Sequence, residues 1–145
     1  MRFQSKQYVR WGDLDAFGHV NNATYLVYAQ EARYEWSKMI EMVVARAEVD
    51  FIAPIYTGDI YIDVEIWVNK IGTSSFGVTY EMKYENELLA VVKTVQVTVS
   101  MDTKEKSKLH QYRVILNMGD VNEYLQHHQF HRHLHQQMSV DRSGR

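Results

Sequence analysis

Residues 60–101 carry the pattern that most limits the possible folds, because apolar and polar side chains alternate there through three consecutive segments. Alternation with a period of two is typical of strands that bury one face. The segments are 60–69, 76–84 and 88–101, separated by the short turn sequences KIGTSS and ENE. Strands joined by short turns pair antiparallel, so we expect an antiparallel sheet. A phase change near Lys93 indicates a bulge or an edge in the last segment.

One helical pattern precedes these strands. Asn21 or Asn22 is a natural N-cap, since a short polar side chain can accept hydrogen bonds from the free amides of a first helical turn. Residues 2–11 predict a further, half-exposed strand. A helix with one apolar stripe needs a sheet to cover it, so the sequence predicts an α+β domain with the sheet curled around one long helix. The stripe recurs at spacings of three and four and comprises Tyr25, Tyr28, Ala29, Ala32, Trp36, Met39, Ile40 and Val43.

Length and composition exclude several classes of protein. A chain of 145 residues with 46% hydrophobic residues is typical of one globular domain. The net charge of -2 argues against a nucleic-acid partner. The absence of cysteine excludes a disulfide framework, a thiolate metal site and a cysteine nucleophile. Residues 1–11 lack the apolar run of a secretory signal and no apolar stretch is long enough to span a bilayer, so we expect a cytoplasmic protein.

The last part of the chain differs in character from the rest. We expect a domain over residues 1–109, followed by a His-rich helical extension or tail over residues 110–145. His127, His131 and His135 are four residues apart, and on a continuous helix such a ladder could chelate a transition metal. Because the string lacks the glutamate of a zinc-protease motif and any cysteine, we predict no functional metal site.

The stretch WGDLDAFGHVNNATY, residues 11–25, concentrates polar side chains where the helix begins. The amides of a helix N-terminus can stabilise a carbonyl oxygen as it becomes negative. A nearby carboxylate, Asp13 or Asp15, would supply a base or a nucleophile, and Gly18 would allow a close backbone approach. The simpler interpretation is that these residues only form a turn and a cap, and composition alone favours it.

This string closely resembles the signature of hot-dog-fold acyl thioesterases of the 4-hydroxybenzoyl-CoA thioesterase type. GHVNN is also similar to a segment of plant acyl-carrier-protein thioesterases, and the resemblance extends over roughly residues 3–103. It implies a hot-dog fold, in which a five-stranded antiparallel sheet wraps around one long helix, here with an additional C-terminal helix or tail. It also implies hydrolysis of an acyl-CoA or acyl-carrier-protein thioester without a cofactor, by a homodimer or homotetramer with a site shared between subunits.

The resemblance also implies catalytic roles. Asp15 would be the catalytic carboxylate, acting as nucleophile or as general base on water, whereas Asp13 would support the turn. Gly18 would bring the chain close to the thioester, and the backbone N–H near Asn22 would polarise the carbonyl. His19 would orient the loop or Asp15. Some relatives have histidine at the position of Asn22, so no second titratable group is assumed there.

Substrate contacts are expected from four further residues. Asn21 would help to orient the loop, and Tyr25 belongs to the core but has a face near the helix start. Ser74 and Ser75 would border the thioester or pantetheine channel. Exposed lysines on strands usually only improve solubility, so none is assigned to the phosphates of coenzyme A; those considered are Lys70, Lys83 and Lys93.

Two other functions are compatible with the same residues. A dehydratase or hydratase of the same fold would act on an acyl thioester without releasing thiol, and a non-catalytic module would only bind one. The identity of the acyl group, the choice between coenzyme A and an acyl-carrier protein, and the choice between dimer and tetramer are left open.

Overall fold

The computed structural model describes residues 2–37, 40–100 and 102–106. The predicted extension over residues 110–145, including the histidine ladder, lies outside the described residues. In order, the elements are β1 (Phe3–Val9), the 3₁₀ helix η1 (Trp11–Asp13), α1 (Thr24–Trp36), β2 (Met42–Phe51), β3 (Ile60–Ile71), β4 (Ser75–Tyr84) and β5 (Glu87–Thr98).

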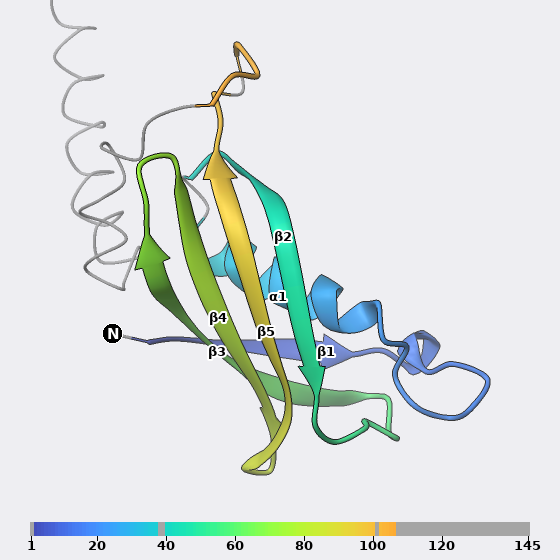
Figure 1. Cartoon of the computed structure of the whole chain (residues 1–145). Helices are drawn as coiled ribbons and strands as arrows, with labels where there is room; N and C mark the ends of the chain where they lie inside the picture. The colour runs from blue at the N-terminus through green and yellow to red at the C-terminus, as the bar shows by residue number, and fades with distance from the viewer. Residues whose placement is uncertain (1, 38–39, 101, 107–145) are drawn as a thin grey trace, which may run out of the picture.

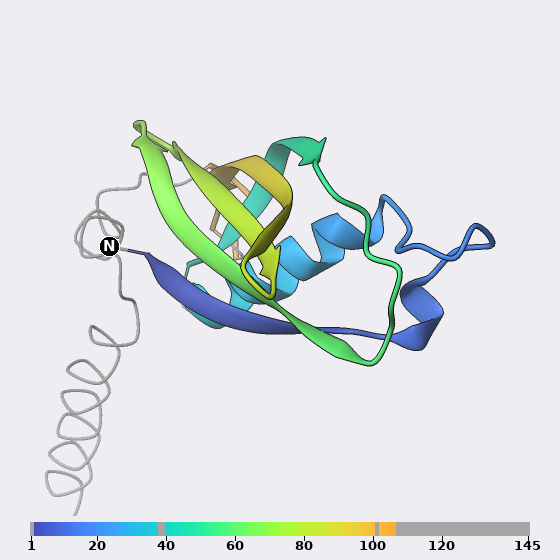
Figure 2. The ribbon, with the colours of Figure 1, turned by 90° about the horizontal axis from the view of Figure 1, so that it is seen from below.

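The five strands form one antiparallel sheet in the order β1-β3-β4-β5-β2. Consecutive strands β3, β4 and β5 are neighbours, as their short connections predict, whereas β1 and β2 form the two edges. The sheet curls around α1, which contacts β1, β3 and β5 (Figures 1 and 2). The predicted α+β hot-dog architecture is thereby confirmed.

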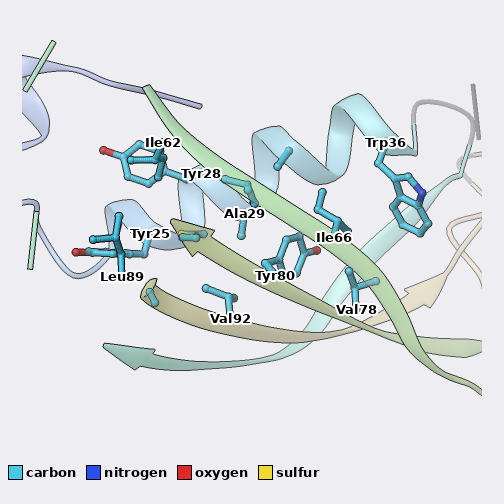
Figure 3. Close-up of a cluster of buried hydrophobic side chains, with 14 of the residues drawn as sticks. Tyr25, Tyr28, Ala29, Trp36, Ile62, Ile66, Val78, Tyr80, Leu89 and Val92 are labelled. Atoms are coloured by element: carbon cyan, nitrogen blue, oxygen red, sulfur yellow. The ribbon is translucent and has the colours of Figure 1, made fainter. Parts of the chain in front are cut away.

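The core fills the space between α1 and the inner face of the sheet (Figure 3). Along β3, Ile62, Val64 and Ile66 are buried, as the alternation predicts. Trp36 at the end of α1 contacts Phe76 of β4, with ring centroids 6.4 Å apart. The predicted helical stripe is buried over one side of α1, through Tyr25, Tyr28, Ala29, Ala32 and Trp36.

The helix is shorter than its apolar pattern predicts. It ends at Trp36, and the backbone N–H and the hydroxyl of Ser37 both donate to the carbonyl of Arg33. Val43, predicted on the helical stripe, lies in β2, where it pairs with Val97 of β5. The apolar residues beyond Trp36 therefore continue the helical spacing only by chance, since Val43 belongs to a strand. The predicted extension of the helix through Val43 is wrong.

The helix start also differs in detail from the prediction. The N-cap residue is Ala23, and neither asparagine caps the helix with its side chain. Instead, the Asn21 side-chain oxygen accepts from the Ala23 amide at 2.9 Å, in the turn before the helix. Asn21 thus shapes the entry to α1, and Asn22 is left exposed.

The expected phase change near Lys93 does not occur. The buried residues Val92, Thr94 and Gln96 keep one phase along β5. The buried residues are apolar up to Val92 and polar at Thr94 and Gln96. In the sequence, this switch looks as if the buried face had moved to the other set of alternate residues. β5 lies between β4 and β2, so it is not an edge. Its pairing shifts register at two places: between Val44 and Arg46 of β2, and against β4, where Met82 pairs with Ala90 and Lys83 with Leu88. The second shift skips Leu89, so the irregularity within β5 lies four residues before Lys93.

No helix within the described ranges is long and apolar enough to cross a membrane.

Candidate functional site

Asp13 ties the start of the polar loop to α1. Its carboxylate accepts hydrogen bonds from the Arg10 amide at 3.0 Å, the Arg10 Nε at 3.0 Å and the Tyr28 hydroxyl at 2.7 Å. Burial opposes the charge on Asp13, but these donors, Tyr28 first, hold the pKa of the carboxyl below its usual value. Burial and the bond to Asp13 raise the pKa of Tyr28. Asp13 is therefore ionised and buried, and both of its carboxylate oxygens accept hydrogen bonds.

Asp15, two residues later, heads a tight turn. Its amide donates to the His19 carbonyl at 2.8 Å, and its carbonyl accepts from the Gly18 amide at 3.0 Å. Gly18 has φ +80°, a left-handed conformation that favours glycine. The Asp15 Oδ1 accepts from the Phe17 amide at 2.8 Å, while Oδ2 lies 3.6 Å from the His19 Nδ1. Oδ2 is thus turned toward His19 and accepts no hydrogen bond from the described residues.

Backbone pairing fixes both ends of this turn. Leu14 and Val20 form an antiparallel bridge across its base. The Val20 amide donates to the Ile55 carbonyl, and the Asn21 amide donates to the Asp13 carbonyl, both at 2.9 Å. The loop with Asp15 is therefore held against both η1 and the segment that leads into β3.

The amide of Asn22, at the entry to α1, is unused among the described residues. The amides of Asn21, Ala23 and Thr24 donate to the Asp13 carbonyl, the Asn21 side chain and the Asn21 carbonyl, respectively. Within the described residues, the amide of Asn22 has no acceptor. It lies at the helix start, where the backbone carries partial positive charge.

A cavity of about 120 Å³ opens at this point. Tyr25 and Phe51 form one aromatic wall, with ring centroids 5.2 Å apart. His19 borders the cavity and lies between the exposed rings of Phe17 and Tyr56, each with its centroid 6.4 Å away. The lining residues are His19, Val20, Asn22, Tyr25, Phe51, Ile52, Ala53 and Pro54.

A family model for the thioesterase-like superfamily matches residues 9–116, which include every element of the site. The chain belongs to the thioesterase-like superfamily. The predicted class of enzyme, a thioester hydrolase, is confirmed with it.

Named relatives and solved structures agree with this assignment. A 1,4-dihydroxy-2-naphthoyl-CoA hydrolase of Nostoc punctiforme is 28% identical, over 75% of this chain and 82% of its own length. One of Synechococcus elongatus is 25% identical, over 74% of this chain and 88% of its own. A thioesterase of Thermus thermophilus, solved with coenzyme A and zinc, is 30% identical, with a TM-score of 0.72 over 79% of this chain and 92% of its own.

The superfamily fold brings together most of the predicted site residues. Asp15, Gly18 and His19 share one turn, and His19, Asn22 and Tyr25 line the cavity. Asn21 shapes the turn between them.

Ser74 and Ser75 lie elsewhere in this thioesterase-like fold. Ser74 lies in the connection from β3 to β4 and Ser75 begins β4, at the opposite end of the molecule from the polar loop (Figures 1 and 2). Neither borders the cavity within this chain, so their role as substrate contacts stays a prediction.

No pattern in the sequence indicated the part of the cavity wall that residues 51–54 form. Phe51 ends a strand that the helical pattern concealed, and Ile52 and Pro54 follow it in an irregular segment. Among the described residues, no three His, Asp or Glu side chains gather as metal ligands.

Proposed function

We propose that the chain hydrolyses an acyl-CoA thioester, with Asp15 as nucleophile or general base and the amide of Asn22 as the group that polarises the thioester carbonyl. One observation carries this proposal. Within the described residues, Asp15 turns a carboxylate oxygen that accepts no hydrogen bond toward His19. His19 lines the cavity together with Asn22, whose amide has no acceptor among those residues.

The chemistry requires both groups. As a water oxygen bonds to the carbonyl carbon, the carbonyl oxygen becomes negative, and an N–H aimed at it lowers the barrier. Asp15 accepts the proton of the water in the general-base route, or forms a mixed anhydride that water then opens in the nucleophilic route. In either route the carbon–sulfur bond breaks, and the products are a free acid and a thiol.

Replacing Asp15 tests this assignment. Asp15→Asn keeps the acceptor for the Phe17 amide but removes the charge, so we expect hydrolysis to fall by about two orders of magnitude or more, with unchanged circular dichroism. Asp63→Asn, an exposed acid on β3 paired with Lys6, is the matched control and should keep full activity. Released thiol is measured with a chromogenic reagent.

An unaffected rate in Asp15→Asn would remove Asp15 from the mechanism. The same assay separates the alternatives, since a dehydratase or hydratase consumes the acyl thioester without releasing thiol, and a binding module leaves it intact.

For the acyl group we propose an aromatic ring. The names of the Nostoc and Synechococcus relatives and the aromatic wall of Tyr25 and Phe51 support this choice. Aromatic rings prefer edge or offset contacts with other rings. A panel of aromatic and straight-chain acyl-CoA substrates, with an acyl-carrier-protein thioester, tests both the acyl group and the carrier. A preference for straight chains in kcat/KM would contradict it.

We further propose that the active unit is a homodimer joined through β2. This edge strand is long, and Val43, Val44 and Phe51 on it are exposed, which is the kind of edge that soluble proteins cover. Antiparallel self-pairing centred on Ala47 would place Arg46 of each copy opposite Glu48 of the other. A twofold contact of this kind is self-complementary.

The size of the cavity supports a shared site. Ligand pockets usually measure about 300–1,000 Å³, whereas the cavity measures about 120 Å³. Because Phe51 lies both in the cavity wall and on the exposed edge, a second copy at β2 would extend that wall.

Ala47→Asp tests the interface by placing two like charges at its centre. We expect a monomer by light scattering, with lost hydrolysis, whereas Thr73→Asp in the exposed β3–β4 connection should keep the wild-type mass. A monomeric wild-type protein would refute the dimer. The role of Asp15 is tested separately, by the hydrolysis assay on Asp15→Asn.

A further inference from the structure

A second hollow lies on the outer face of the sheet, away from the site. It is a groove of about 310 Å³ lined by Arg46, Glu48, Asn69, Lys70, Gly72, Ser75, Phe76, Gly77, Lys93, Thr94 and Val95. The inner face holds α1 and the core, and the buried neighbours Phe76 and Val78 point there, so Gly77 between them faces outward. The sheet therefore separates this groove from the cavity at the start of α1 (Figure 1).

Strand register explains the shape of the groove. A cross-strand row runs from Lys70 through Gly77 and Val95 to Arg46, so long cations stand at the ends and small side chains between them. Adjacent strands lie about 4.8 Å apart, so the row spans roughly 14 Å. The groove thus runs across four strands and has a shallow centre.

Gly77 leaves room for a neighbouring side chain at that centre. A Cβ there would lie 2.2 Å from the Asn69 Oδ1. The Asn69 side chain crosses over Gly77 and donates to the Thr79 hydroxyl at 2.7 Å. A fixed amide therefore forms part of the wall, and Ser75 adds a hydroxyl.

The groove carries uncompensated positive charge. Arg46 is paired with Glu48. Within the described residues, Lys70 and Lys93 have no carboxylate at ion-pair distance, although Lys93 is opposite Glu48 in the register. Lys83 on the same face differs, because it lies 2.9 Å from Glu81 and 3.9 Å from Glu65. Of the three lysines considered from the sequence, two are thus available to an anion.

We propose that this groove binds the diphosphate and nucleoside of a nucleotide, as a second site distinct from the cavity at the start of α1. Lys70 and Lys93 pair with the phosphates, since an ammonium binds a phosphate as a point charge. The flat surface at Val95 receives the base, and Asn69, which covers Gly77, and Ser75 supply hydrogen bonds. The volume is at the lower end of the range for ligand sites. A compact nucleotide therefore suits the groove better than a polymer, and the net charge of -2 also disfavours nucleic acid.

Calorimetry on the full chain tests the proposal, with ADP, free coenzyme A and adenosine as ligands. ADP or coenzyme A should bind, and adenosine, which lacks phosphate, should bind at least about tenfold more weakly. In the double variant Lys70→Gln, Lys93→Gln the affinity should fall about tenfold or more, whereas Lys83→Gln should stay within about twofold of wild type.

The two nucleotide sources give different results. Coenzyme A binding more tightly than ADP would identify the nucleotide end of the acyl carrier as the ligand, and equal affinities would identify a free nucleotide. The proposal would be overturned if neither ADP nor coenzyme A bound, or if adenosine bound as tightly as they do. It would also be overturned if the affinity of the double variant equalled that of the wild type. None of these titrations requires hydrolysis, so they are independent of the assay on Asp15.

Discussion

The hydrogen bond from Tyr28 to Asp13 is expected to be a main support of the loop that carries Asp15. Tyr28 is buried in α1, and its hydroxyl lies 2.7 Å from the Asp13 Oδ2. Tyr28→Phe removes only this donor and keeps the ring in the core. A hydrogen bond to a charged group contributes about 1.5–3 kcal/mol, so we expect the free energy of unfolding to fall by that amount.

The effect of this substitution should depend on pH. The pKa of Asp13 in the folded protein is lowered below its ordinary value of 3.8, so its ionised form stabilises the fold above that pH. This stabilisation disappears as the pH falls through the lowered pKa, because the carboxyl then becomes neutral in both states. The difference between wild type and Tyr28→Phe should therefore be largest near neutral pH and shrink in acid.

Urea unfolding at several pH values measures this difference. Tyr34→Phe is the matched control, since Tyr34 lies on the same helix with its side chain exposed, and it should change stability by less than about 0.5 kcal/mol. A loss in Tyr28→Phe no larger than in Tyr34→Phe, or a difference that stays constant down to pH 3, would refute the reasoning.

Two glycines in and around the loop give further predictions. Gly18→Ala forces a side chain into a left-handed conformation with φ +80°, which should lower the free energy of unfolding by about 1–2 kcal/mol and reduce kcat through the displaced Asp15; unchanged thermal unfolding would contradict this. Gly58→Ala places a Cβ 2.8 Å from the Trp11 Cα and should cost about 1–3 kcal/mol in urea unfolding. Gly12→Ala, with no atom within 4 Å of its Cβ, is the control, and equal losses in both would refute the close contact.

The strands that the sequence predicts best are those with one buried face. Ile62, Val64 and Ile66 alternate because α1 covers them, and burial of alternate residues is what a period of two records. β2 has no such signal, because most of its residues are exposed. The sequence of such an edge strand does not differ clearly from the continuation of a helix. The start of β2 is therefore wrongly predicted as helix.

The end of β5 shows a second limit of pattern analysis. Thr94 and Gln96 are buried although they are polar, because they join a network with Tyr80 and Arg33 on the inner face. The sequence of the strand alone does not distinguish polar residues that are buried on the inner face from polar residues that face solvent. The partners come from two other elements, Tyr80 from β4 and Arg33 from α1, which the pattern of β5 alone does not place.

The two carboxylates of the polar loop show how far the sequence could decide between structure and chemistry. Asp13 fits the simpler interpretation, since its buried carboxylate accepts three hydrogen bonds from Arg10 and Tyr28. One oxygen of Asp15 accepts from the Phe17 amide in the turn, and the other, which accepts no hydrogen bond from the described residues, faces His19. Two aspartates separated by one residue therefore have different hydrogen-bonding surroundings, because a donor from α1 reaches only the first. That donor is Tyr28, which follows Asp13 by fifteen residues, and this contact depends on how the helix packs rather than on the motif itself.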